Sequence, residues 1–141
     1  MRDITPTLRL QHYDLPAMDK AHHRFTALLG ALPLVSHQAL PCLLGNLIRT
    51  VREHCDQEER FMLATDYKDY GHHRAQHQQL LSTLEHHQHQ LELGMELDPL
   101  DIHTLLCSWQ DEHQQRWDDP LASHLRHATC WKTSQQATAA A

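Results

Sequence analysis

Residues 54 to 62 read HCDQEERFM, and this stretch decides how the chain has to fold. Its His54 and Glu58 are four residues apart and continue a helical stripe that contains Leu47 and Val51. Side chains three and four residues apart lie on one face of a helix, so an imidazole and a carboxylate occupy an apolar face. Burying either group without a partner costs several kcal/mol. We therefore expect other parts of the chain to supply partners for both.

The composition indicates a single all-α domain. The chain has 141 residues, enough for one compact core, and only 4 of them are glycine. Leu, Gln, His, Glu and Ala dominate, and these residues form helices or tolerate them well. The histidine count of 15 is several times ordinary usage, so the histidines that lie on core faces become the main question.

Charge and hydropathy argue against several classes of protein. The net charge of −6 disfavours a nucleic-acid-binding protein, which would carry a basic patch. The chain contains no apolar run long enough to cross a membrane and no apolar leader segment near its start. The 4 cysteines are scattered without a C-x-x-C pair, which favours free thiols in a reducing compartment. We expect a cytoplasmic protein with no membrane or nucleic-acid partner.

Proline, glycine and capping residues divide the chain into four long helices. We expect them to run from Asp14 to Gly30 or Pro33, from Pro41 to about Thr65, from Tyr70 to Leu93, and from Asp98 to Asp118 or Asp119. The short connections predict an up-down-up-down antiparallel four-helix bundle. Residues 14–119 would form this bundle, residues 1–13 an N-terminal arm, and residues 120–141 a short helix from 121 to about 131 followed by a tail.

The inward face of every predicted helix contains histidine. Helical spacing places six polar side chains on these inward faces, whereas His23 and His72 fall on outward ones. Asp118, five residues after His113, is a seventh candidate. The seven are His22, His54, Glu58, His73, His77, His113 and Asp118. Cys55 falls off the inward stripe. We expect the remaining histidines to lie on the surface: His12, His37, His86, His87, His89, His103, His124 and His127.

Two local spacings bear on metal binding. His73 and His77, like His54 and Glu58, are four apart and can reach one ion from one helix face. His113 and Asp118 are five apart, about 140° on an ideal helix, so a shared site needs the carboxylate to reach back or the helix to loosen.

Five imidazoles and two carboxylates are too many ligands for one ion. Two octahedral ions offer about twelve positions; two bridging carboxylates, five histidines and one bridging oxygen fill about eleven. One position remains for a small ligand. Nitrogen and oxygen donors in this geometry suit iron or manganese better than tetrahedral zinc.

Four motifs in the right order resemble the hemerythrin family over about residues 13–119. They are HCDQEERFM, H-x3-H at His73 and His77, W-x3-H-x4-D from Trp109 to Asp118, and D-x2-H-x2-F from Asp19 to Phe25. The resemblance implies a four-helix bundle that holds two iron ions with an oxo or hydroxo bridge and binds dioxygen reversibly. It further implies that one iron is held by His73, His77 and His113 and the other by His22 and His54, with Glu58 and Asp118 bridging. The vacancy would then be on the second iron.

The implied ligand pocket departs from the family pattern. The resemblance places Phe25, Trp109, Gln110 and Gln114 around the pocket, and the family usually has apolar residues at the two glutamine positions. Amides in the pocket would hydrogen-bond the ligand or admit water. The alternative is a slightly rotated fourth helix with both glutamines facing solvent. Pro120 is also unusual so soon after Asp118, where it either re-aims that carboxylate or only ends the helix.

Several functions remain open at this point. The leading prediction is a dioxygen-binding protein, not an enzyme, that stores, delivers or scavenges the gas. A second is sensing, in which oxygen, nitric oxide or redox state changes a surface that a partner protein reads. A third is a peroxidase or nitric oxide reductase acting at the same vacancy. The last is a bundle whose histidines bind metal only adventitiously. Reversible oxygenation would support the first function, and a ligand-dependent change of shape would support the second. Turnover of peroxide or nitric oxide would support the third.

Overall fold

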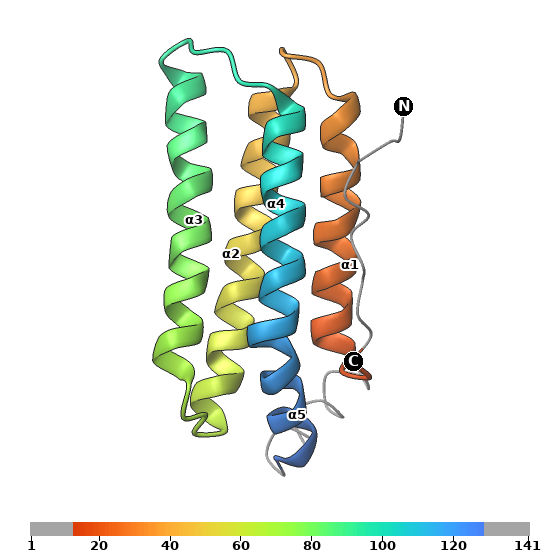
Figure 1. Ribbon diagram of the computed structural model, residues 1–141, viewed down its shortest axis with the longest axis vertical. Coiled ribbons are helices and arrows are strands. Elements are labelled where there is room, and N and C mark those ends of the chain that lie inside the picture. Colours follow the sequence, from red (N-terminus) through yellow and green to blue (C-terminus); the bar gives the residue numbers. More distant parts are fainter. Residues whose placement is uncertain (1–12, 129–141) are drawn as a thin grey trace.

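The structure is a computed structural model that describes residues 13–128, and in this range it is all-helical (Figure 1). Four long helices pack together. The elements are α1 (Pro16–Ala31), the 3-10 helix η1 (Leu32–Leu34), α2 (Leu40–Ala64), α3 (Tyr70–Glu92), α4 (Pro99–His113), the π-helix η2 (Gln114–Asp118) and α5 (Asp119–His127). Residues 1–12 and 129–141 lie outside the described residues, and with them His12, Cys130 and most of the expected arm and tail.

The first three long helices begin and end within about two residues of the predicted positions, whereas the fourth ends as an α-helix at His113 and the short last helix runs from Asp119 to His127. Proline occupies the first turn of α1, α2, α4 and α5, where its missing N–H leaves no hydrogen bond unmade. The Asp98 carboxylate accepts a hydrogen bond from the Leu100 N–H at 2.9 Å and caps α4. Gly94, just beyond α3, has a φ of 82°, a conformation that glycine adopts without strain.

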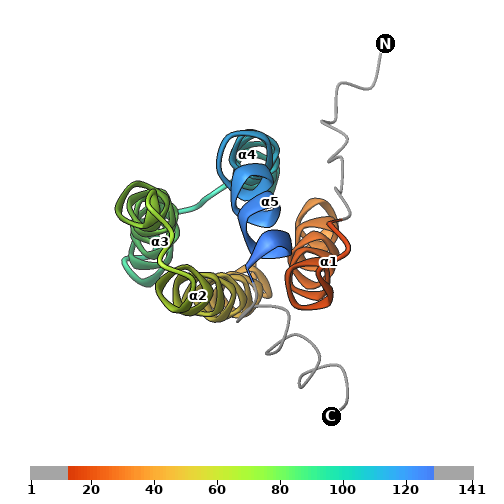
Figure 2. The same ribbon diagram turned by 90° about the horizontal axis from the view of Figure 1, so that it is seen from below.

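The end view shows α1 to α4 around a shared interior, with α5 across the end at which α4 finishes (Figure 2). The interior holds two apolar clusters. The larger contains residues such as Leu29, Leu44, Leu84 and Leu106 from all four long helices. The smaller lies at the α5 end and consists of Tyr13, Leu15, Met18, Met62, Leu121, Ala122 and Leu125.

A polar layer separates these two clusters. Along α1, His22 lies between Met18 of the smaller cluster and Phe25 of the larger one, and α2 repeats this order between Met62 and Val51. Beyond His113 of α4, the smaller cluster resumes in α5 at Leu121. The polar side chains are thus closed off from above and below by packed hydrocarbon. Such a layer is stable only if its members satisfy one another or hold an ion.

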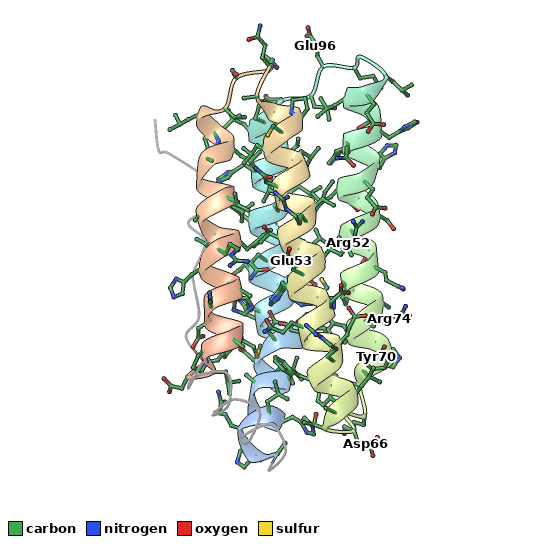
Figure 3. The ribbon with its side chains drawn as sticks, turned by 180° about the vertical axis from the view of Figure 1, so that it is seen from behind. Arg52, Glu53, Asp66, Tyr70, Arg74 and Glu96 are labelled. Carbon is green, nitrogen blue, oxygen red and sulfur yellow. The ribbon has the colours of Figure 1, made fainter. Side chains whose placement is uncertain are left out.

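Charged residues cover the outside of the bundle (Figure 3). Arg52 pairs with Glu85 across α2 and α3, and Arg74 Nε lies 3.1 Å from Glu59 Oε1. These pairs link α2 to α3 on their solvent side. None of the helices within residues 13–128 has both the length and the hydropathy needed to cross a membrane.

Two predictions about burial were wrong, and two histidines expected on the surface, His87 and His124, are half-buried. Cys55, expected off the inward stripe, is 1% exposed, because the buried face of α2 is wider than one stripe and also takes in Ile48. His103, expected on the surface, is 8% exposed, and its Nε2 lies 3.5 Å from Cys107 Sγ on the broad buried face of α4. His124 is half-buried, with Nε2 2.9 Å from Thr65 Oγ1. His23 and His72 are exposed as predicted.

Candidate metal centre

The polar layer contains all seven side chains that the sequence singled out. Six of them are almost completely buried, and His54 retains 15% exposure of its side chain. All four long helices contribute: His22 from α1, His54 and Glu58 from α2, His73 and His77 from α3, and His113 from α4. Asp118, the seventh, is the last residue of η2.

Glu58 connects histidines of two helices. Its Oε1 lies 3.1 Å from His77 Nε2 and 3.2 Å from His73 Nε2, both on α3. Its Oε2 lies 2.9 Å from His54 Nε2, one turn back along α2. A carboxylate whose two oxygens face different sets of imidazoles has the arrangement of a bridging group.

Asp118 makes the matching connection from the opposite side. Its Oδ1 lies 3.0 Å from His113 Nε2 and 3.3 Å from His73 Nε2, and its Oδ2 lies 3.2 Å from His22 Nε2. All five histidines therefore turn Nε2 toward the two carboxylates.

A π-helix brings Asp118 to this position. In an α-helix, residues 113 and 118 would point about 140° apart. Residues 114–118 instead form η2, whose i to i+5 hydrogen bonds widen the helix by one residue and return Asp118 to the face of His113. Of the two solutions that the spacing of these residues left open, the structure therefore shows the loosened helix. The predicted fourth helix therefore ends as an α-helix at His113.

Two overlapping groups of ligand atoms result, each with its atoms within 4.8 Å of one another. We call them the three-histidine group and the two-histidine group. The first consists of Glu58, His73, His77 and His113, and the second of His22, His54, Glu58 and Asp118. Glu58 belongs to both.

The donor atoms of the two groups fit metal ions better than they fit one another. Within the described residues, His22 Nε2, Glu58 Oε2 and both oxygens of Asp118 are buried and make no hydrogen bond of acceptable geometry, despite the close approaches. The Nε2 atoms of His73 and His113 lie 3.2 Å apart. Two nitrogens that bind one ion at about 2.1 Å and at right angles lie about 3 Å apart. The side chains thus point at shared positions between them, and the residues present can hold metal.

Neighbouring side chains hold the histidines in place. Glu59 Oε2 lies 3.3 Å from His77 Nδ1, the ring nitrogen that faces away from Glu58. A carboxylate on the far nitrogen fixes the orientation of a metal-binding histidine and makes it more basic. Trp109 stacks on His113 with ring centroids 4.3 Å apart, and Tyr13 packs edge-on against His22 at 5.6 Å. Sequence reasoning missed Glu59 and Tyr13 because nothing in their spacing marks them.

The mutual contacts shift the pKa values of the cluster. Burial by itself would lower the pKa of His77, but hydrogen bonds with Cys55, Glu58 and Glu59 outweigh it and raise that pKa to about 12. Burial would raise the pKa of Glu58, yet the surrounding imidazoles hold it well below its usual range, as they do for Asp118. Burial lowers the pKa of His113. Without metal, imidazolium–carboxylate pairs therefore stabilise the layer.

A small cavity adjoins the two-histidine group. It has a volume of ≈ 10 Å³, room for about one water-sized molecule, and its wall is mostly apolar. Its lining is His22, Phe25, Thr50, Val51, His54, Cys55, Leu80, Trp109 and Gln110. Three of the four residues predicted for the ligand pocket therefore line it. Gln114 does not line this cavity, although it is as deeply buried as Gln110, so the alternative in which both glutamines face solvent is wrong.

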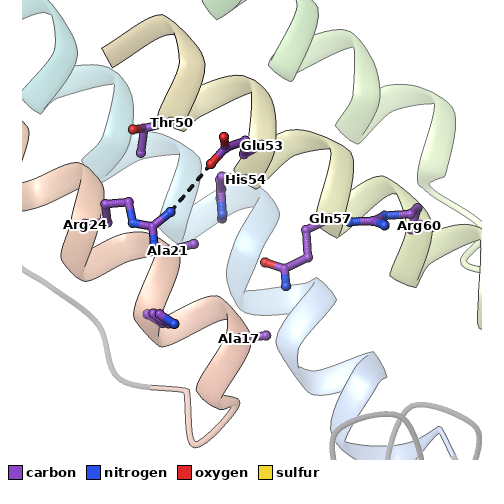
Figure 4. A pocket seen from close by; sticks show the side chains of 9 residues that line it. Ala17, Ala21, Arg24, Thr50, Glu53, His54, Gln57 and Arg60 are labelled. Carbon is purple, nitrogen blue, oxygen red and sulfur yellow. Dashed lines mark ion pairs between the residues drawn. The ribbon is translucent and has the colours of Figure 1, made fainter. Parts of the chain in front are cut away.

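An open groove between α1 and α2 borders the same group from outside (Figure 4). His54 lies at its floor, and the small side chains of Ala17 and Ala21 leave the groove open. The ion pair of Arg24 and Glu53, 3.5 Å apart, crosses its rim. The two-histidine group is therefore the part of the centre that lies nearest to solvent.

Comparisons with protein-family models, with curated proteins and with solved structures found no match to this chain. The resemblance to hemerythrins thus depends on the four sequence motifs alone. What the structure contributes is a buried His, Glu and Asp cluster that could hold metal.

Proposed function

We propose that the protein is a hemerythrin-like di-iron protein that binds dioxygen reversibly. The observation that carries the proposal is the pair of overlapping ligand groups, with three histidines in one, two in the other and a shared carboxylate. Nitrogen and oxygen donors in this number suit iron or manganese and leave the two-histidine ion one ligand short. The small cavity lies on that side.

We also infer the up-down-up-down antiparallel topology. In its support, the α1–α2 and α3–α4 connections lie at one end of the bundle and the α2–α3 connection at the other (Figure 1). In this topology each long helix contributes polar side chains at the same level along the bundle axis. Four independent inward stripes can then supply ligands to one pair of ions.

The seven polar side chains divide between the two ions. His73, His77 and His113 would hold one ion, His22 and His54 the other, and Glu58 and Asp118 would bridge them. Bound as a pair, ferrous ions supply two electrons and one open position, which is what reversible dioxygen binding requires. Phe25, Leu80 and Trp109 exclude bulk water from that position.

The test is anaerobic reduction of the iron-loaded protein followed by exposure to air, with the visible spectrum recorded over minutes. The proposal predicts two irons per chain and an absorption band that appears with oxygen and disappears on degassing. A preparation with one iron or none contradicts it. Immediate oxidation that degassing does not reverse would instead favour the enzymatic or sensing function.

A further inference from the structure

Gln110 places an amide in the wall of the small cavity. Its side chain is 3% exposed, and its Nε2 is buried without a hydrogen-bond partner among the described residues. An amide nitrogen buried in this way destabilises a fold, because the hydrogen bond it loses to water is not replaced. A partner from outside the chain would satisfy it.

The position of Gln110 indicates where this partner sits. His22 and His54, which together form the two-histidine group, line the same cavity, as does the apolar ring of Phe25. His22 Nε2 is likewise buried without hydrogen-bond geometry. A molecule in the cavity would therefore have the proposed open position on one side and the side chain of Gln110, whose amide nitrogen lacks a partner, on another, with mostly hydrocarbon elsewhere.

This environment selects for charge on the ligand. A donor in an apolar, water-excluded space interacts strongly with an acceptor that carries negative charge and weakly with a neutral one. The cavity has room for about one water-sized molecule, so it accommodates the outer end of a small ligand whose inner atom occupies the open position.

We propose that Gln110 donates a hydrogen bond from Nε2 to a small anionic ligand at the two-histidine group and so positions it. The inference rests on the proposed function, since it takes the open position to be on that side. The ligand class is anions of two or three atoms whose outer atom accepts a hydrogen bond. Gln110 acts here as a positioning residue.

The test measures sodium azide binding to the oxidised, iron-loaded protein by visible absorption. Gln110→Met removes the donor while keeping a side chain of similar length and volume. We expect azide affinity to fall roughly tenfold or more, as for loss of a hydrogen bond to a charged group. Gln88→Met, at a half-buried position of α3 outside the cavity lining, is the control and should leave the affinity unchanged.

Two further readouts separate positioning from a structural role. The azide stretching band should shift between H2O and D2O in the wild type, and Gln110→Met should remove that shift. In the metal-free protein, Gln110→Met should leave the urea midpoint of unfolding unchanged or raise it, because an unpartnered amide is removed. A lower midpoint, or equal azide affinity in fully loaded protein, would overturn this inference alone. Failure to take up two irons would overturn the proposed function as well.

Discussion

The three-histidine group and the two-histidine group share a carboxylate but differ in how they are enclosed. In the first, the rings of His73, His77 and His113 contact one another, with centroids 4.6 to 5.2 Å apart. Glu59 and Trp109 support two of these rings from behind. In the second, the ring centroids of His22 and His54 are 5.0 Å apart, both rings line a small cavity, and His54 also lines an open groove.

Under the proposed function, this difference in enclosure gives the two groups different roles. The three histidines are almost completely buried, which suits an ion that stays saturated, although a pocket of ≈ 20 Å³ lies against His113 between Trp109 and Trp117. An ion with fewer ligands, a small cavity and a nearby route to solvent suits exchange of a small molecule. The asymmetry therefore arises from packing around the histidines and not only from their number.

The largest expected effect follows from removing the group that both halves share. Glu58→Ala should reduce bound iron from two per chain to none, since Glu58 contacts histidines of both groups. Metal analysis measures the loss, and circular dichroism checks that helix content is kept. The exposed Glu53→Ala is the matched control on the same helix. Retention of both irons in Glu58→Ala would contradict the bridging assignment.

Removing one histidine from each half should give unequal results. His54→Ala leaves the three-histidine group intact, so we expect about one iron to remain, with no reversible oxygen band. His77→Ala leaves two histidines on each side, and we expect less than one iron. The exposed His72→Ala on α3 is the control and should keep two. Equal losses in the two variants would remove the distinction between the halves.

The sequence predicted the helices and the polar layer well because both depend on local rules. Proline marks helix starts because its ring fixes φ and it has no backbone N–H, and glycine marks helix ends because it adopts a positive φ without strain. The spacing of residues along the sequence determines which side chains share a helix face. His22 and His73 could therefore be separated from His23 and His72 without any tertiary information.

The sequence failed where the answer depends on a neighbouring helix. His103 and Cys55 are buried because α4 and α2 each face more than one neighbour, and periodicity does not give the width of a buried face. The orientation of Gln110 and Gln114 was undecided for the same reason. The spacing of His113 and Asp118 posed the geometric problem, but it left two solutions open, and only the structure selected the π-helix.

The stability of the metal-free protein should fall both at high pH and at low pH. The pKa of His77 is raised from its unfolded value of about 6.5 to about 12 in the folded state, so its contribution is complete below pH 6.5 and is lost as pH rises. The depressed pKa values of Glu58 and Asp118 give stability that is lost as pH falls below about 4.5. Because burial lowers the pKa of His113, stability also falls as pH drops below 6.5, so metal-free protein should be most stable near pH 6.5.

Urea unfolding at several pH values measures this profile. Above pH 6.5 the free energy of unfolding of the metal-free protein should fall by at most about 1.4 kcal/mol per pH unit for each histidine with a raised pKa. Iron-loaded protein should show no such fall, because metal binding already requires neutral histidines. A parallel decline with and without iron would show that the imidazoles are not the ligands.

The smallest expected effect concerns the π-helix that joins the two halves through Asp118. Deleting the exposed Gln115 would place the aspartate four residues after His113, where an ordinary α-helix also turns it toward the cluster. We expect both irons to remain and the free energy of unfolding to change by less than about 1 kcal/mol. Inserting one alanine after Gln115 would instead turn the carboxylate away and should lower iron to one per chain or less. If the deletion loses iron while the insertion keeps it, the widened turn serves a purpose other than aiming Asp118.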